Sequence, residues 1–255
     1  MSQDLLYEVK DRVAFLTINR ESKRNAISQD MITAFLDYLD RADQDEQVRA
    51  VCITGAGEKA FCSGADLAAA VSKEAGSGAR NYAELLKKMA RFGKPLLARV
   101  NGSCLAGGIG LMLSCDIVIA RSDAFFCTPE INVGIFPMMV GAVLCRNVSR
   151  KKFTDMILTG RRISAPEAED IGLITSAVEP DRLDEEVQKT LKLLTSKSPI
   201  GIRMGKEAFR AMSDMGFDAA VDYLCDALGR VISTEDAREG MMAFVEKREP
   251  EFKGK

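Results

Sequence analysis

The chain has 255 residues, of which 47% are hydrophobic and 28% are charged, and its formal net charge is -2. This composition is enough for one substantial core with a smaller appended layer, and the balanced charge argues against a nucleic-acid-binding surface. The sequence contains no histidine, which excludes Ser-His-Asp and Cys-His nucleophiles, histidine-containing metal sites and histidine proton relays. Acid–base chemistry is therefore left to carboxylates, lysine, tyrosine or water.

The seven cysteines lie singly within apolar runs and never in a C-x-x-C pair. Buried free thiols in a reducing compartment explain this pattern better than disulfides or a zinc site. Residues 1–12 are mixed in charge and lack an apolar signal core, and no apolar run is long enough to span a bilayer. We therefore expect a soluble, cytoplasmic protein without a membrane partner.

In chain order, the first predicted elements are two strands at residues 5–9 and 13–18, followed by a polar loop over residues 19–26. The basic side chains of this loop are those of Arg20, Lys23 and Arg24. Basic residues in a loop can bind a phosphate group, but a solvated cluster is the commoner arrangement. The residues alone leave both possibilities open.

A helix is predicted from the cap residue Ser28 to about residue 43. Its inward face carries Met31, Phe35 and Leu39. Residues 49–54 are typical of a buried strand, and residues 55–60 match the G-x-G-x-x-A part of a dinucleotide-binding fingerprint. That fingerprint needs a helix opening at the glycines, whereas residues 61–66 favour continued turns. We therefore predict no dinucleotide site.

Residues 71–80 are rich in glycine, serine and lysine, and we expect a mobile loop that lies over the functional site. Residues 81–91 predict a helix that ends before the Gly93-Lys94-Pro95 segment. Its inward side chains are expected to be Leu85, Leu86 and Met89.

The most informative stretch begins with a predicted buried strand at residues 96–100, which Asn101 and the glycine after it interrupt. Gly107 and Gly108 then allow a tight turn just before a short apolar helix at residues 109–115. A glycine turn that opens a helix leaves backbone N–H groups pointing outward. Such groups suit an anion or a developing oxyanion.

Two further strands are predicted after this helix, and then Glu130 follows Pro129. The apolar side chains around Glu130 in the sequence are Phe125, Phe126, Ile131, Val133, Ile135 and Phe136. A carboxylate in such surroundings is partly desolvated, which raises its pKa toward the range useful for proton transfer near neutral pH. A solvated glutamate on a loop is an alternative of about equal weight.

Helical patterns dominate the remainder of the chain. We predict helices at 138–148, 150–158, 165–172 and 181–195 and one more strand at 174–178. From residue 198 onward the strand signal disappears, and helices are expected to the end. This division predicts a core unit over residues 1–197 and a helical region over residues 198–255 that packs on a neighbouring subunit.

The order of these motifs resembles the crotonase, or enoyl-CoA hydratase/isomerase, superfamily over nearly the whole chain. The segments that carry the resemblance are N-A-I at 25–27, A-F-C-S-G-A-D-L at 60–67, V-N-G-S-C-L-A-G-G at 100–108, C-D-I at 115–117, P-E-I-N-V-G-I-F-P at 129–137 and A-F-V-E-K-R at 243–248. The resemblance implies an α/β fold, a crotonase-like spiral of repeated ββα units, with a helical C-terminal oligomerisation region. It also implies a homotrimer or a dimer of trimers.

The resemblance implies an acyl-CoA-processing enzyme of fatty acid metabolism, such as β-oxidation. The backbone N–H groups of Ala65 and Gly107 would form an oxyanion hole for the thioester, and Glu130 would be the base. The implied substrate-binding residues are Lys23, Arg24, Ala26, Ser63, Asp66, Leu67, Gly108, Gly110, Pro137, Phe244 and Lys247. No metal and no cofactor are implied, since coenzyme A arrives as part of the thioester substrate.

One position departs from the pattern of the family hydratases, which use two glutamates. The first of these aligns with Gly110, which has no side chain to hold or activate water. The remaining single-glutamate pattern resembles the Δ3,Δ2-enoyl-CoA isomerase branch. We therefore expect an isomerase or a weak hydratase, and the alternative is a catalytically weak or inactive acyl-CoA-binding subunit.

Overall fold

The computed structural model describes residues 3–66 and 75–255. Its larger sheet has the strand order β1-β2-β3-β5-β7-β10, in which β1 is antiparallel to β2 and the other pairs are parallel. These strands are β1 (Leu5–Lys10), β2 (Val13–Ile18), β3 (Ala50–Gly55), β5 (Leu96–Val100), β7 (Ile117–Arg121) and β10 (Ser176–Val178). The sequence predicted five of these strands to within two residues at each end, and it predicted β7 without bounds.

A smaller sheet has the order β4-β6-β8-β9. Its strands are β4 (Ala60–Cys62), β6 (Ser103–Leu105), β8 (Phe125–Cys127) and β9 (Ile163–Ser164). The first three are parallel, with Cys62 opposite Cys104 and Leu105 opposite Cys127. The chain thus passes from one sheet to the other at β3-β4, β5-β6 and β7-β8, which confirms the predicted spiral of ββα units. Because β4 begins where a dinucleotide site needs a helix, the structure agrees with the rejection of that motif.

The main core lies between the larger sheet and three helices, α1 (Gln29–Gln44), α3 (Ala75–Ala90) and α4 (Gly107–Leu113). On the other face of the sheet, α8 (Leu183–Thr195) buries Leu183, Val187 and Leu191 against strands β2, β3, β5 and β7. Ser28 caps α1 as predicted, because its hydroxyl accepts a hydrogen bond from the N–H of Met31 at 3.1 Å. The sheet is therefore covered on both sides.

The predicted loop at residues 71–80 requires a correction. Residues 71–74 lie outside the described residues, but α3 already begins at Ala75 and includes the rest of this stretch. The reason is its packing on α1. Asn81 donates a hydrogen bond to Gln29 at 3.0 Å, and a Cβ at Gly78 would lie 2.9 Å from the same side chain. Gly78 thus serves a close helix contact, which overrides its low helix propensity.

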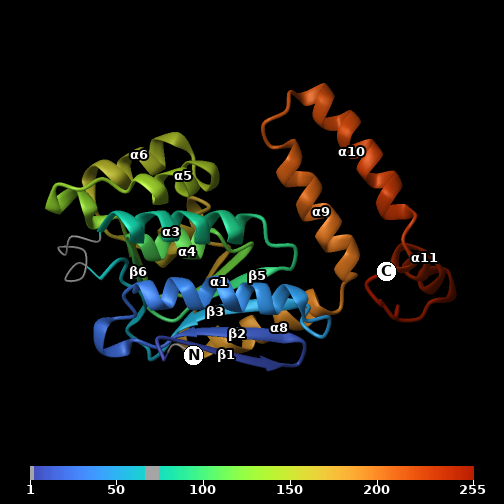
Figure 1. Cartoon of the computed structure of the whole chain (residues 1–255), viewed down its shortest axis with the longest axis horizontal. Coiled ribbons are helices and arrows are strands. Elements are labelled where there is room, and N and C mark those ends of the chain that lie inside the picture. The colour runs from blue at the N-terminus through green and yellow to red at the C-terminus, as the bar shows by residue number, and fades with distance from the viewer. Residues whose placement is uncertain (1–2, 67–74) are drawn as a thin grey trace.

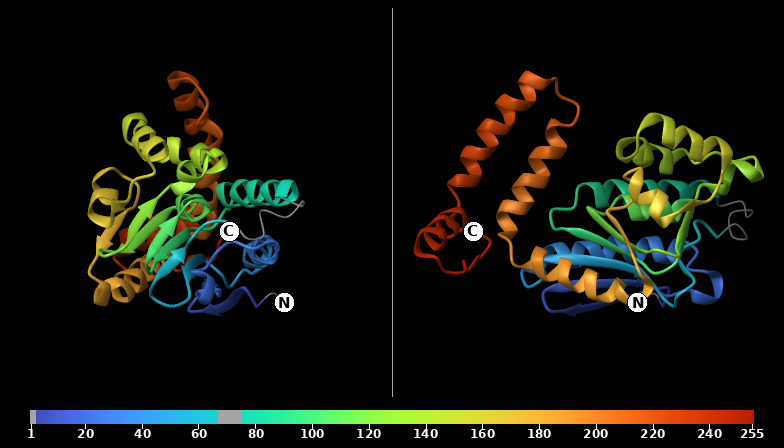
Figure 2. Two further views of the ribbon diagram at one scale, coloured as in Figure 1. Left: turned by 90° about the vertical axis from the view of Figure 1, so that its left-hand side faces the viewer. Right: turned by 180° about the vertical axis from the view of Figure 1, so that it is seen from behind.

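The remaining helices agree with the prediction in part: the short helix in the predicted polar loop and the one at Glu130 were not predicted, and the helices after residue 198 were predicted only as a helical region. The remaining helices are η1 (Glu21–Lys23), η2 (Pro129–Val133), α5 (Met138–Asn147), α6 (Arg150–Thr159), α7 (Ala165–Asp170), η3 (Pro180–Arg182), α9 (Pro199–Met212), α10 (Phe217–Ile232) and α11 (Glu235–Glu246). Figures 1 and 2 show α9 and α10 side by side, projecting away from the two sheets, with α11 beyond them. An ion pair between Lys206 and Asp116 and another between Arg203 and Asp43 hold α9 to the core.

The cysteines are all free, and five of them are buried. Cys145 and Cys225 are exposed, which corrects the expectation that every thiol is buried. Both lie on amphipathic helices, α5 and α10, where an apolar run in the sequence includes one outward position per turn. Across residues 3–66 and 75–255, no helix combines the length and the apolar character that crossing a membrane requires.

Candidate active site

Three neighbouring parallel strands bring the candidate residues to one edge of the smaller sheet. The segments that leave the carboxyl ends of β4, β6 and β8 contain Ala65, Gly107 and Glu130, respectively. The carboxyl ends of parallel strands meet at the same edge, where α/β proteins commonly bind ligands. The N–H of Ala106 donates to the carbonyl of Cys127 at 2.9 Å, which ties the second segment to the third.

Two backbone amides at this edge are free to bind a ligand. The N–H of Ile27 donates to Gly64 O at 2.8 Å, and the N–H of Asp66 donates to Ile27 O at 3.1 Å. Ala65 lies between these two hydrogen bonds, and its own N–H takes part in neither of them. Gly107 opens α4, so its N–H precedes the first intrahelical hydrogen bond. Neither amide has a hydrogen-bond partner within the part of the chain that the structure describes.

The turn before α4 differs from the prediction in one respect. The residue with a left-handed backbone is Ala106, at φ 49°, and Gly107 and Gly108 already belong to the helix. Gly108 is required by space, since a Cβ there would lie 2.5 Å from the carbonyl oxygen of Cys62. Position 64 requires glycine for two reasons: its φ is +87°, and a Cβ there would lie 2.5 Å from the Cβ of Ala106. The glycines thus bring the two amide-bearing segments together.

Glu130 lies in the first turn of η2, directly after the buried Thr128 and the proline. Burial raises the pKa of its carboxyl group, and only a hydrogen bond from its own backbone opposes this. The oxygen Oε2 is buried and has no hydrogen-bond partner among the described residues. Of the two alternatives left open by the sequence, the structure therefore supports the desolvated carboxylate.

The source of this desolvation was predicted only in part. Val133, Ile135 and Phe136 are exposed in the single chain, so they do not enclose the carboxyl group. The residues that precede it, Phe126 and Thr128, are buried instead, and the Thr128 hydroxyl donates to Met156 O at 2.9 Å. Val133 ends η2 and residues 134–136 follow it, and an apolar sequence run of this kind does not specify a buried face.

The structure adds a residue that the sequence interpretation missed. Tyr82 of α3 is buried, and its hydroxyl donates a hydrogen bond to the carbonyl of Gly107 at 2.5 Å. A Cβ at Gly110 would overlap that hydroxyl oxygen. Burial raises the pKa of Tyr82 well above its ordinary value, and the electrostatic effect of the nearby Cys62, Cys104 and Glu130 raises it further. The signal was present, because Tyr82 lies three residues before Leu85 on the inward face of the same helix.

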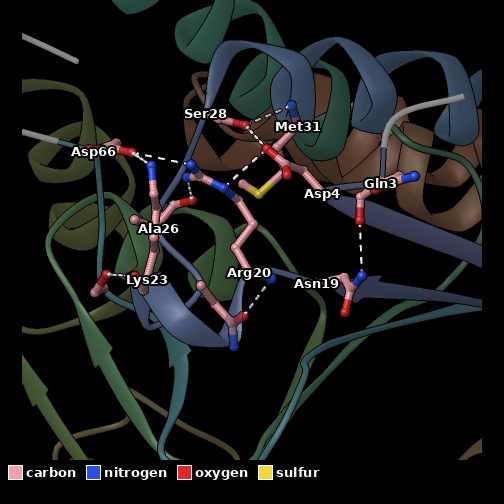
Figure 3. Close-up of polar contacts among 11 residues, drawn as sticks. Gln3, Asp4, Asn19, Arg20, Lys23, Ala26, Ser28, Met31 and Asp66 are labelled. Atoms are coloured by element: carbon pink, nitrogen blue, oxygen red, sulfur yellow. Dashed lines mark hydrogen bonds and ion pairs between the residues drawn. The ribbon is translucent and has the colours of Figure 1, made fainter. Parts of the chain in front are cut away.

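The loop before α1 is held by ion pairs. Arg20 contacts Asp4 at 3.0 Å and Asp66 at 3.2 Å, and it donates to the carbonyl of Ala26 at 2.5 Å (Figure 3). Lys23 also reaches Asp66, at 3.2 Å. Lys23 and then Arg20 lower the pKa of Asp66. The predicted contact residue Asp66 therefore holds this loop, while Lys23 and Arg24 are exposed to solvent.

Asn25 explains the beginning of the N-A-I motif in structural terms. Its buried amide donates to Ala56 O at 3.0 Å and to Ala60 O at 2.7 Å, and it accepts from the N–H of Arg20 at 3.1 Å. The N–H of Ser63 donates to Arg24 O at 3.1 Å. The basic loop is thus fastened to the segment that leads to the free amide of Ala65.

The structure does not place three other predicted contact residues at this edge. Leu67 is outside the described residues. Phe244 is 84% exposed on α11 and Lys247 caps that helix, which lies at the opposite end of the molecule from β6 and α4 in Figures 1 and 2. A single chain therefore does not bring these two residues to Glu130.

Pro137 is buried at the start of α5. The next side chain, that of Met138, is 73% exposed, whereas Met139 packs on the core. Met139 also lines an apolar hollow of ≈ 670 Å³ between α3 and α5, together with Ala83, Leu86, Ala142 and Val143. Only one of the two methionines after Pro137 thus faces an apolar cavity.

Comparisons with known proteins agree with this architecture. Residues 8–255 match the family model described as enoyl-CoA hydratase/isomerase. The short-chain-enoyl-CoA hydratase of Clostridium acetobutylicum is 35% identical over 253 residues, which is 97% of each chain. The crotonyl-CoA hydratase of Syntrophomonas wolfei is 35% identical over 255 residues, which is 98% of each chain.

Solved structures give the same result. The crystal structure of an enoyl-CoA hydratase from Bacillus anthracis has a TM-score of 0.95 and 32% identity, and the match covers 99% of this chain and 100% of that one. An enoyl-CoA hydratase from Mycobacterium smegmatis has a TM-score of 0.94 and 33% identity, with 98% and 99% covered. The similarity therefore extends over the full length of both chains.

Proposed function

Since the chain belongs to the enoyl-CoA hydratase/isomerase family, we propose that it transfers a proton at C2 of an enoyl-CoA thioester. The N–H groups of Ala65 and Gly107 bind the thioester oxygen, and Glu130 carries the proton. One observation carries this proposal: two amides without partners in the described residues lie at the same strand edge as a desolvated carboxyl group.

The chemistry requires both parts. Removal of a proton from C2 places negative charge on the thioester oxygen, and two converging N–H donors stabilise that charge without a charged side chain. The loss of one such donor typically costs about 3 kcal/mol of transition-state stabilisation. The raised pKa of Glu130 makes it a stronger base once ionised, so it takes a proton from carbon and returns it more effectively than an exposed glutamate does.

Gly110 bears on the type of reaction. It has no carboxylate to hold a water molecule, which favours isomerisation, in which Glu130 removes a proton from C2 and returns it at C4. The relatives named above are hydratases by their names, and a slower hydration with Glu130 as the only carboxylate is the second outcome. An acyl-CoA-binding subunit without turnover is the third, and it agrees with Gly110 but leaves the desolvation of Glu130 unexplained.

Coenzyme A enters as part of the substrate, and we propose no separate cofactor. Lys23 and Arg24 are exposed on the loop fastened to Ser63, so their positive charges suit the phosphate groups of the nucleotide. Six further residues act through the backbone, because they hold the segments that form the substrate site. They are Ala26, Ser63, Asp66, Gly108, Gly110 and Pro137. Leu67 stays in the proposal from the family resemblance alone.

We propose that the chain assembles as a homotrimer or a dimer of trimers through residues 198–255. The apolar side chains that α9 to α11 expose are Phe209, Phe217, Val221, Leu228, Ile232, Met241, Met242, Phe244 and Val245. A group of this size on a soluble protein is typical of an interaction surface. Assembly would also explain the distance between Phe244 and Glu130, because a neighbouring subunit can supply the former.

The substitution Glu130→Gln tests the proposed base. We expect it to lower kcat by about 10²- to 10⁴-fold with both 2-enoyl and 3-enoyl thioesters, while the thioester still binds. Initial rates over several chain lengths and calorimetric binding measure the two properties. Glu207→Gln, at an exposed position on α9, is the matched control and should leave both unchanged. Normal turnover by the Glu130 variant would refute the proposal, and binding without turnover by the wild type would favour the acyl-CoA-binding subunit.

A further inference from the structure

The hydroxyl of Tyr82 lies where three features of the site meet. It donates to the carbonyl of Gly107, it occupies the space of a side chain at position 110, and it approaches the ideal Cβ position of Gly107 to 3.6 Å. The proposed oxyanion donor is the N–H of that same Gly107. A tyrosine on a different helix therefore contacts the residue on which the proposed function depends.

We propose that Tyr82 is a positioning residue of this site, whose hydroxyl holds Gly107 so that its N–H points at the thioester oxygen. This inference rests on the proposed function. It also explains the glycine at position 110, because the Tyr82 hydroxyl and a side chain at that position exclude each other. The resemblance aligns Gly110 with the additional carboxylate of two-glutamate hydratases, and here the Tyr82 phenol fills the space beside that position.

The segment around Gly107 needs such an anchor. Its N-cap is Ala106, which makes no side-chain hydrogen bond to the helix and has a left-handed φ of 49°. Two glycines follow at once, and glycine has the widest backbone freedom of any residue. α4 has only seven residues, and they are all apolar or glycine. Within the described residues, Tyr82 supplies the side-chain hydrogen bond that reaches the first residue of this helix.

Tyr82 is itself held rigidly. Its side chain is 7% exposed, and Leu85 and Met89 bury the same face of α3. The position of the hydroxyl is therefore set by the packing of α3 on α1 and α4. The phenol must also remain protonated to donate. The raised pKa of Tyr82 ensures this throughout the neutral range.

Removal of the hydroxyl alone tests the inference. With Tyr82→Phe, we expect kcat to fall about 10- to 100-fold, since a small misplacement of a catalytic group has effects of this size. KM should change less than threefold, because the ring and the binding surface remain. The matched control is Tyr7→Phe, which also removes a buried hydroxyl but on β1, where that group has no partner among the described residues. It should leave both constants unchanged.

A second readout reports the oxyanion hole without turnover. The absorption band of a cinnamoyl-type CoA thioester moves to longer wavelength when hydrogen bonds polarise its carbonyl group. We expect the wild type and Tyr7→Phe to give this shift on binding, and Tyr82→Phe to bind the thioester with a smaller shift. An effect on the fold alone would change binding or the melting temperature instead.

Gly110→Ala provides an independent variant. Its added Cβ overlaps the Tyr82 hydroxyl, so it should displace that hydroxyl and reproduce the loss in kcat and in spectral shift. In the Tyr82→Phe background the same Cβ lies 3.4 Å from Cζ of the ring and 3.5 Å from Val140, which are ordinary contacts. The double variant should therefore resemble Tyr82→Phe alone, a strongly non-additive result.

The outcomes separate this inference from the proposed function. A Tyr82→Phe variant with the kcat and the spectral shift of the wild type would overturn the inference and leave the oxyanion hole intact. Equal losses of binding and turnover, or additive effects of the two substitutions, would also overturn it, because they indicate a structural role only. Absence of both shift and turnover in the wild type would instead refute the oxyanion hole itself, and the role of Tyr82 with it.

Discussion

Glu130 combines a functional position with a thermodynamic cost. One carboxylate oxygen is buried without a hydrogen-bond partner in the described residues, and burial raises the pKa of the group. An ionised carboxylate is thus less stable in the folded chain than in the unfolded chain. We predict that Glu130→Gln, besides lowering kcat, stabilises the fold at pH 7 by about 1 kcal/mol. Urea unfolding at a series of pH values measures this.

The sign of the pH dependence follows from the raised pKa. Below the ordinary value of 4.5, Glu130 is protonated in both states, and the variant should have no advantage. As the pH rises above 4.5, the unfolded chain ionises first, so the wild type loses stability relative to the variant until the folded pKa is passed. An advantage of the variant that is constant from pH 4 to pH 7 would mean that ionisation is not its cause.

At the same scale, the sequence allowed some residues to be predicted and not others. Ala65, Gly107 and Glu130 lie in local motifs, and the structure brings them to one sheet edge. The contact of Tyr82 with Gly107 and Gly110 was not visible, because it depends on the packing of α3 near α4. The ion pairs of Asp66 with Arg20 and Lys23 were not predicted either, since a sequence does not show which charges will pair.

Helix α1 depends on a side chain from a distant segment, the one that leads into β5. The ammonium group of Lys94, which is 7% exposed, donates to Ala42 O at 2.6 Å and to Asp45 O at 2.7 Å at the end of this helix. Burial lowers the pKa of Lys94. We predict that Lys94→Met destabilises the fold by about 2 kcal/mol, because it leaves two carbonyl groups without their charged donor.

Chemical denaturation of Lys94→Met and of Lys192→Met measures this effect, since Lys192 is exposed on α8 and serves as the control. The control should change stability by less than 0.5 kcal/mol or so. Equal stability of the two variants would show that Lys94 does not cap the helix. The rate with a CoA thioester, measured below the unfolding transition, should stay the same in both.

Elements of five or more residues were predictable because hydrophobic periodicity needs several residues to appear. β4, β6 and β9 have two or three residues each and were missed. They pair through contacts distant in sequence, such as Cys104 with Phe126. The start of α3 was missed for the opposite reason, since its glycines indicate a loop until the packing on α1 is known. Local chemistry therefore predicted the larger sheet, while tertiary pairing formed the smaller one that carries the site.

The whole molecule leaves part of its proposed substrate site at a distance. Phe244 lies on α11, far from β6 and α4, and its side chain is almost fully exposed. If a neighbouring subunit completes the site, Phe244 of one chain contributes to the substrate site that contains Glu130 of another chain. We predict that Phe244→Asp lowers kcat/KM at least tenfold while the chain still folds, because an acidic side chain replaces an apolar contact and repels the phosphate groups of coenzyme A.

Mixed oligomers distinguish action between subunits from action within one. Glu130→Gln lacks the base and Phe244→Asp lacks the contact, so each variant alone is weak. Coexpression creates interfaces where a native Glu130 from one chain meets a native Phe244 from another, and activity should exceed the sum of the two variants. A double variant coexpressed with the wild type is the control for subunit mixing, and light scattering checks the oligomeric state. Failure of the mixed oligomers to regain activity would place Phe244 outside the neighbour's site, because a contact confined to one chain can never be restored by another.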